Sequence, residues 1–147
     1  FDVPTAFIDV FLKLNKEVYN YEYRHFIVFV IFFLSSIFVL KILFKRYNSI
    51  FISLFGTSLY IFSPRIFGDS FHNNKDIIFL SLVVCSIYFI FRIFEKKKIK
   101  YLFLFSLFSA LATSTRVMGV FLPISLFLFL ILGNKKDDLF ANAKYIK

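Results

Sequence analysis

Residues 101–132 read YLFLFSLFSALATSTRVMGVFLPISLFLFLIL, with Arg116 as their one charged residue. A single α-helix of this stretch would be about 48 Å long, whereas the hydrocarbon core of a bilayer is about 30 Å thick. Lys-rich segments flank the stretch at residues 96–100 and 135–147. Because cytoplasmic loops collect Lys and Arg, both flanks are expected on one side of the membrane. The stretch therefore predicts two short membrane helices joined near residues 113–116.

The rest of the chain extends this pattern. Of its 147 residues, 59% are hydrophobic, whereas soluble domains are about 45–50% apolar. Apolar runs alternate with short charged segments, which predicts an all-α polytopic membrane helix bundle of about five transmembrane helices. The expected spans are residues 25–44, 47–64, 77–94, 101–114 and 117–132. Residues 133–147 are expected to form a cytoplasmic loop.

The distribution of charge predicts which side each loop faces. When the loops are assigned alternately to the two sides, the whole net charge of +9 falls on one of them. This is the positive-inside pattern of membrane proteins. The basic residues are therefore expected to set topology and to meet anionic lipid headgroups. The lipid bilayer is the predicted partner, and nucleic acid is not.

The N-terminal segment is too polar to span a membrane. Residues 4–17 carry apolar side chains at helical spacing, and Asp9, Lys13 and Glu17 form a charged stripe. Residues 1–24 are therefore predicted to be an outer-face loop with an amphipathic juxtamembrane helix. A packed helix of an outer domain is the alternative. The chain begins at Phe1 and its only methionine is Met118, which predicts a piece of a larger protein.

Ionisable residues avoid the centres of the expected spans and gather in two outer loops. The first is residues 63–76, where Pro64 is expected to end a helix and Gly68 to allow a bend. Ion- and proton-coupled transporters usually place charged groups near the midplane instead. A site at the membrane boundary suits an enzyme that acts on a lipid-linked substrate.

Several residues of this first loop are candidates for chemistry. Asp76 could be catalytic by binding an acceptor hydroxyl, or could bind a divalent metal ion. Arg65 and Lys75 are expected to meet phosphate. The alternative is that Asn74 or Asp76 merely caps the next helix, where the helix dipole favours a carboxylate. His72 is either a metal ligand or acid–base group, or a solvated loop histidine.

The second loop is the polar break at residues 112–119, ATSTRVMG. Arg116 would lie at a helix N-terminus beside Thr and Ser hydroxyls, which suits a phosphate clamp. Snorkelling of Arg116 to the membrane interface is the alternative. Glu22 and Arg24, close to the first span, either pair with each other or complete the site.

These segments resemble those of a known enzyme family. Residues 21–25 (YEYRH), 63–76 and 112–119 resemble the GT-C membrane glycosyltransferases. The most similar branch includes bacterial relatives of dolichyl-phosphate-mannose–protein mannosyltransferases and the lipid A aminoarabinose transferase. The resemblance implies transfer of a sugar from a polyprenyl-phosphate donor to a protein, lipid or glycan acceptor. It further implies a bacterial inner-membrane protein with a periplasmic active face.

The resemblance also implies roles for particular residues. In such enzymes an acid in the first outer loop activates the acceptor, and a second acid at the start of a later span supports the site. Asp76 matches the second acid, and the first is expected upstream of Phe1, so the fragment is expected to be inactive alone. The expected substrate-binding residues are Arg65, Lys75, Arg116, Arg24, His72 and Asn74.

Two other functions remain open from the residues alone. A multi-pass transporter or flippase fragment would be favoured by inverted repeats or mid-span charges in further sequence. A non-catalytic membrane scaffold would be favoured if substitutions at Asp76 and Arg116 changed only the protein level.

Overall fold

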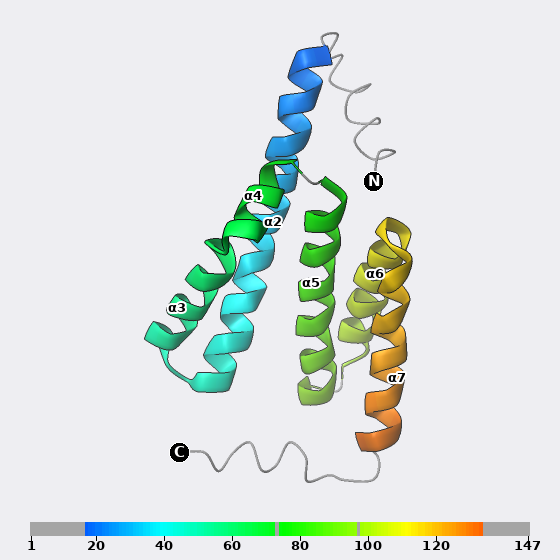
Figure 1. The fold of residues 1–147 in the computed structure, drawn as a ribbon. Helices are drawn as coiled ribbons and strands as arrows, with labels where there is room; N and C mark the ends of the chain where they lie inside the picture. The colour runs from blue at the N-terminus through cyan, green and yellow to red at the C-terminus, as the bar shows by residue number, and fades with distance from the viewer. Residues whose placement is uncertain (1–16, 73, 97, 134–147) are drawn as a thin grey trace.

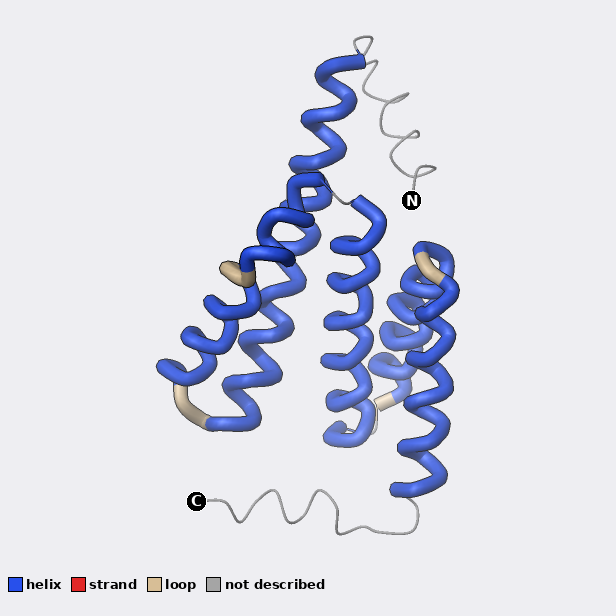
Figure 2. Tube along the Cα trace, in the orientation of Figure 1, coloured by secondary structure: helices blue, strands red, loops and turns tan. Residues whose placement is uncertain are grey.

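The computed structural model describes residues 17–72, 74–96 and 98–133. In these ranges it is helical apart from short connections and contains no strand (Figures 1 and 2). The elements are α2 (Glu17–Tyr47), α3 (Ile50–Ile61), α4 (Pro64–His72), α5 (Asn74–Lys96), α6 (Ile99–Thr115), the 3₁₀ turn η1 (Val117–Val120) and α7 (Phe121–Gly133). The prediction of an all-α membrane helical protein is confirmed.

The helices run up and down alternately, so their connections fall at two ends of the molecule (Figure 1). The upper end holds α4, the start of α5 and the connection from α6 to η1. The lower end holds the turn after α2 and the connection from α5 to α6. The predicted break in the stretch 101–132 is present, because Arg116 has an extended backbone (φ −146°, ψ 136°) between α6 and η1.

Helix lengths bear on how the chain crosses a membrane. His25–Tyr47 and Lys75–Lys96 are long and apolar enough to span a bilayer. Helices α3 and α4 pass the same test only as a pair, bent by 55°. The helices Ile99–Thr115 and Val117–Ile131 are apolar but shorter. The alternating arrangement fits five crossings, and their number stays a prediction.

Helix bounds in the predicted second span differ from those expected. Tyr47 belongs to α2, and the chain turns at Asn48, whose positive φ of 49° Asn tolerates better than most residues. Pro64 does not end a helix but begins α4, where its missing N–H costs nothing. Gly68 lies inside α4 rather than at a bend. Most of the predicted first outer loop is therefore helix.

The N-terminal prediction is partly outside the described residues. Residues 1–16, which hold most of the predicted amphipathic helix, are not described, and neither is the predicted loop after Gly133. Residues 17–24 do not form a loop, because they are the first turns of α2. A helix of 31 residues is about 46 Å long, so α2 extends beyond a hydrocarbon core of about 30 Å.

Helix α5 is the centre of the bundle. At its upper end, Ile77 and Ile78 pack with Val28 and Phe32 of α2. At its lower end, Phe89 and neighbouring residues pack with α6 and α7. Large apolar side chains on α3, α6 and α7 remain exposed, among them Phe51, Phe103 and Phe121. Exposed apolar surface of this extent marks a membrane-facing surface.

Small hydroxyl residues line the contacts between helices. Their hydroxyl groups donate hydrogen bonds to carbonyl oxygens one turn earlier, as in Thr57 Oγ1 to Ser53 O at 2.8 Å. The same arrangement satisfies Ser35, Ser53, Ser81 and Ser86. A hydroxyl satisfied within its own helix can be buried in hydrocarbon, and its small size allows helices to approach closely.

Candidate functional site

The two predicted loops meet at one ion pair at the upper end of the bundle. Asp76, in the first turn of α5, pairs through Oδ1 with Nη2 of Arg116, between α6 and η1. The two side chains are 38% and 46% exposed, respectively, so both remain reachable from outside. The structure therefore joins the residue predicted to be catalytic with one predicted to bind phosphate.

Local backbone structure fixes both members of the pair. The first turn of α5 carries the positive end of the helix dipole, which favours a carboxylate at Asp76. The extended backbone of Arg116 is held on both sides by hydrogen bonds. Its N–H donates to Ala112 O at 3.0 Å, and its carbonyl oxygen accepts from Gly119 N at 2.9 Å. The break between α6 and η1 is therefore a defined turn.

Close packing of Gly119 makes this turn possible. Gly119 is buried against the last turns of α6. A Cβ atom at this position would lie 2.6 Å from Ala112 C and 2.6 Å from Thr113 Cα, and closer still to the backbone nitrogen of Thr113. Real Cβ atoms do not approach backbone atoms so closely. Only glycine fits here, and sequence reasoning did not assign Gly119 this role.

Two of the other candidate residues lie at the same end of the bundle without an ion pair to a described carboxylate. Arg65, in the first turn of α4, and Lys75, in the first turn of α5, are exposed and form no ion pair with a described carboxylate. His72 ends α4, Asn74 begins α5 and Arg24 lies in α2, but their side chains are outside the described set.

A divalent metal ion would need more ligands than these residues supply. Among the described residues, no group of three or more His, Cys, Asp or Glu side chains could hold a metal ion. Asp76 supplies one carboxylate, which already pairs with Arg116. The described residues therefore do not fit a metal by themselves, and the metal stays a prediction.

An open groove of about 610 Å³ lies beside α6 and the start of α7. Its lining consists of Phe105, Ser106, Ser109, Ala110, Thr113, Ser114, Val120 and Pro123. The hydroxyls of Ser106, Thr113 and Ser114 donate to backbone carbonyls of α6, at 2.8 to 2.9 Å. With these donors satisfied, the groove suits a hydrocarbon chain, and Ser114 places its upper end two residues from Arg116.

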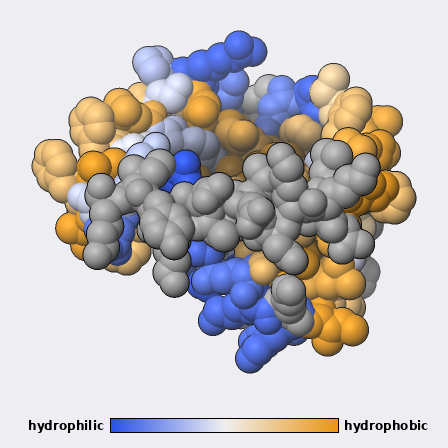
Figure 3. Space-filling model, turned by 90° about the horizontal axis from the view of Figure 1, so that it is seen from below, coloured by the Kyte–Doolittle hydropathy of each residue, from blue (hydrophilic) through white to orange (hydrophobic). Residues whose placement is uncertain are grey.

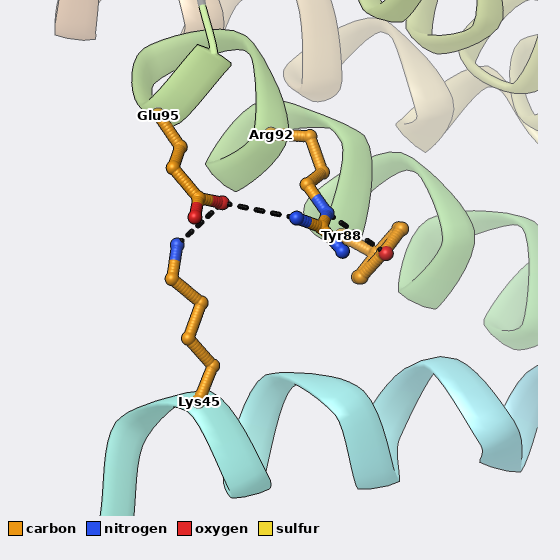
Figure 4. A network of polar contacts seen from close by, with 4 residues as sticks. All are labelled: Lys45, Tyr88, Arg92 and Glu95. Atoms are coloured by element: carbon orange, nitrogen blue, oxygen red, sulfur yellow. Dashed lines mark hydrogen bonds and ion pairs between the residues drawn. The ribbon is translucent and has the colours of Figure 1, made fainter.

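A second polar network, at the lower end, was not predicted (Figure 4). Glu95 Oε2 pairs with Lys45 Nζ at 2.7 Å and with Arg92 Nη1 at 3.3 Å, and Arg92 Nε donates to the Tyr88 hydroxyl at 2.9 Å. The spacing of Tyr88, Arg92 and Glu95 along one helix is a signal that the sequence carries. That Lys45 of α2 pairs with Glu95 could not be predicted from this spacing, because it depends on the packing of α2 against α5.

Comparison with known proteins gives one family. A family model described as dolichyl-phosphate-mannose-protein mannosyltransferase matches residues 3–146, which is nearly the whole chain. No curated protein and no solved structure matches the chain. The match agrees with the helical membrane architecture and with the resemblance carried by residues 21–25, 63–76 and 112–119. The chain therefore belongs to the dolichyl-phosphate-mannose–protein mannosyltransferase family of membrane glycosyltransferases.

Proposed function

We propose that this protein transfers a sugar from a polyprenyl-phosphate donor to a protein, lipid or glycan acceptor, and that the upper end of the bundle holds the donor phosphate. The observation that carries the proposal is the Asp76–Arg116 ion pair, which joins two loops that the sequence singled out independently. Family membership supplies the reaction class. The polyprenyl-phosphate donor and the acceptor classes are inferences from that membership and the site's chemistry.

The reaction explains why an arginine is needed there. An acceptor oxygen attacks the anomeric carbon of the donor sugar, and the bond from that carbon to the phosphate oxygen breaks. The phosphate diester leaves as a monoester, so negative charge grows on it, and a positioned guanidinium stabilises that growth. The acceptor hydroxyl gives its proton to a base, for which we propose an acidic side chain other than Asp76.

Asp76 has two proposed tasks in this reaction. It orients the Arg116 guanidinium toward the donor through the ion pair. Its partly exposed carboxylate also accepts a hydrogen bond from the acceptor hydroxyl, which holds that hydroxyl for attack. Neither task requires the divalent metal predicted from the sequence.

The two ends of the bundle differ in charge, which supports an outer, non-cytoplasmic position for the site. The upper end mixes signs, with Arg65, Lys75 and Arg116 beside Asp69 and Asp76. The lower end is dominated by basic residues, namely Lys41, Lys45, Arg46, Arg92, Lys96, Lys98 and Lys100. By the positive-inside rule the lower end is cytoplasmic. In a bacterium the upper end would face the periplasm.

Replacement of Arg116 tests the phosphate assignment. We expect Arg116→Gln in the full-length protein to lower the release of polyprenyl phosphate from a labelled sugar donor about 100-fold or more, because an oriented cation is lost where charge develops. The matched control is Arg46→Gln, which removes an arginine from the lower end and should keep full release. Equal release from Arg116→Gln and wild type in membranes would reject the phosphate clamp.

The groove beside α6 is the proposed place for the polyprenyl chain. We expect Ala110→Leu, which narrows the groove, to raise the KM for the donor about tenfold while leaving kcat nearly unchanged, because it weakens donor binding and leaves the chemical step intact. The control is Leu111→Phe, which enlarges an exposed residue of α6 outside the groove. The same KM for both variants would mean that the chain binds elsewhere.

A further inference from the structure

The lower end of the bundle carries a cluster of aromatic rings from three helices. Phe38 of α2 lies 5.0 Å from Tyr88 and 6.0 Å from Phe89, both of α5, measured between ring centroids. Phe89 in turn lies 6.5 Å from Tyr101 of α6. These four rings, which we call the lower aromatic cluster, form a continuous layer across α2, α5 and α6.

Each of the three helices adds one cation next to this layer. Lys41 Nζ lies 5.5 Å from the centroid of Phe38, Arg92 Cζ lies 5.2 Å from that of Tyr88, and Lys100 Nζ lies 5.2 Å from that of Tyr101. Helices α2 and α5 run downward (Figure 1), so Lys41 and Arg92 follow their aromatic partners toward the lower end. Helix α6 runs upward, so Lys100, which precedes Tyr101, is also the residue of its pair nearer the lower end.

The charges around this layer are not balanced. Glu95 neutralises part of the positive charge by pairing with Lys45 and Arg92 (Figure 4). Among the described residues, no carboxylate pairs with Lys41 or Lys100. Seen from below, hydrophilic residues gather toward the top and the bottom of the view, and hydrophobic side chains lie at left and right (Figure 3). The lower end thus offers a cationic surface bordered by apolar surface.

We propose that Lys41, Arg92 and Lys100, which lie over rings of the lower aromatic cluster, bind the headgroup phosphates of anionic phospholipids whose acyl chains lie against the apolar flanks. Aromatic residues concentrate at the membrane interface, which is where a headgroup lies. The rings hold the cations in place by cation–π contact, so less side-chain freedom is lost when the phosphate binds. The ring layer distinguishes this site from the general positive charge of a cytoplasmic face.

The test compares two double variants of the full-length protein with the same loss of charge. Lys41→Gln/Lys100→Gln removes two cations that contact rings, whereas Arg46→Gln/Lys98→Gln removes two lower-end cations with no ring contact among the described residues. Native mass spectrometry measures how much phosphatidylglycerol each protein retains from nanodiscs of equal parts phosphatidylcholine and phosphatidylglycerol. Thermal unfolding in phosphatidylcholine alone verifies that each variant is folded.

We expect phosphatidylglycerol binding to weaken about 25-fold in Lys41→Gln/Lys100→Gln, since each direct contact between a lysine and the headgroup phosphate contributes about fivefold. The Arg46→Gln/Lys98→Gln variant should bind nearly as well as wild type. Equal weakening in both variants would overturn the proposal in favour of diffuse surface charge. The proposal would also be overturned if inorganic phosphate raised the thermal unfolding midpoint of wild type, but not of Lys41→Gln/Lys100→Gln, in phosphatidylcholine nanodiscs, because the ligand would then be a free anion.

Discussion

Asp76→Asn should lower the release of polyprenyl phosphate about 100-fold or more in membranes that contain the full-length protein at matched level. The amide keeps the size of the side chain but removes the charge that orients Arg116. It also weakens the hydrogen bond that we propose for the acceptor hydroxyl. The measurement is release of polyprenyl phosphate from labelled donors with several different sugars.

A second carboxylate at the same end supplies the control for this variant. Asp69, on α4, is half-buried and has no proposed role in the reaction, so Asp69→Asn should keep release near the wild-type rate. Equal release from wild type and Asp76→Asn would reduce Asp76 to a helix cap. No release from wild type with any donor would reject polyprenyl-phosphate sugar transfer itself.

The 100-fold loss of activity expected for Asp76→Asn is larger than the small loss of folding stability expected from breaking the ion pair. The ion pair with Arg116 is 38% exposed on the Asp76 side and 46% on the Arg116 side. Pairs as exposed as this contribute about 1 kcal/mol or less to stability. A 100-fold loss of rate corresponds to about 2.7 kcal/mol in the activation free energy. An unchanged thermal unfolding midpoint together with lost release would therefore assign the pair to the reaction.

Gly119→Ala should destabilise the protein strongly. The added Cβ would lie 2.6 Å from Ala112 C and from Thr113 Cα, and these are backbone atoms that cannot rotate away. The turn between α6 and η1 must then open, which costs about 3 kcal/mol or more. We expect the thermal unfolding midpoint in detergent or nanodiscs to fall by roughly 10 °C.

A second glycine provides a control with the same chemical change. A Cβ at Gly68, inside α4, would meet nothing within 4 Å. Gly68→Ala should raise stability by up to about 1 kcal/mol, because alanine favours helix more than glycine does. If both variants unfolded at the wild-type midpoint, the close approach at Gly119 would be wrong. If both were equally destabilised, the effect would not come from packing at the turn.

Gly119→Ala should also alter the candidate site. Gly119 N–H donates to the carbonyl oxygen of Arg116, so opening the turn moves the residue that pairs with Asp76. Activity should therefore fall together with stability in Gly119→Ala. In Asp76→Asn, by contrast, activity should fall alone. Comparison of the two variants therefore distinguishes activity lost because the turn opens from activity lost because the Asp76 carboxylate is removed.

The sequence by itself determined the helical class, the alternation of the helices and the break near Arg116. These features depend on the length and polarity of consecutive residues, because a bilayer admits helices of limited length and excludes charge. The stretch 101–132 was too long for one span and carried its single charge in the middle. Asp76 and Arg116 could be named as candidates for the same reason, since charges that interrupt or border apolar runs are easily seen.

Only the tertiary structure decided which of these residues meet. The pairing of Asp76 with Arg116 requires α5 and α6 to pack side by side, and the contact of Lys45 with Glu95 requires α2 to pack against α5. Local patterns likewise failed at Pro64 and Gly68, which are compatible with both a helix and a turn. The close approach at Gly119 left no local signal, because the atoms that exclude a side chain belong to another turn of the chain. The pattern of apolar and charged residues predicts which segments lie in the membrane. Contacts between helices depend on how they pack together, which cannot be predicted from one helix alone.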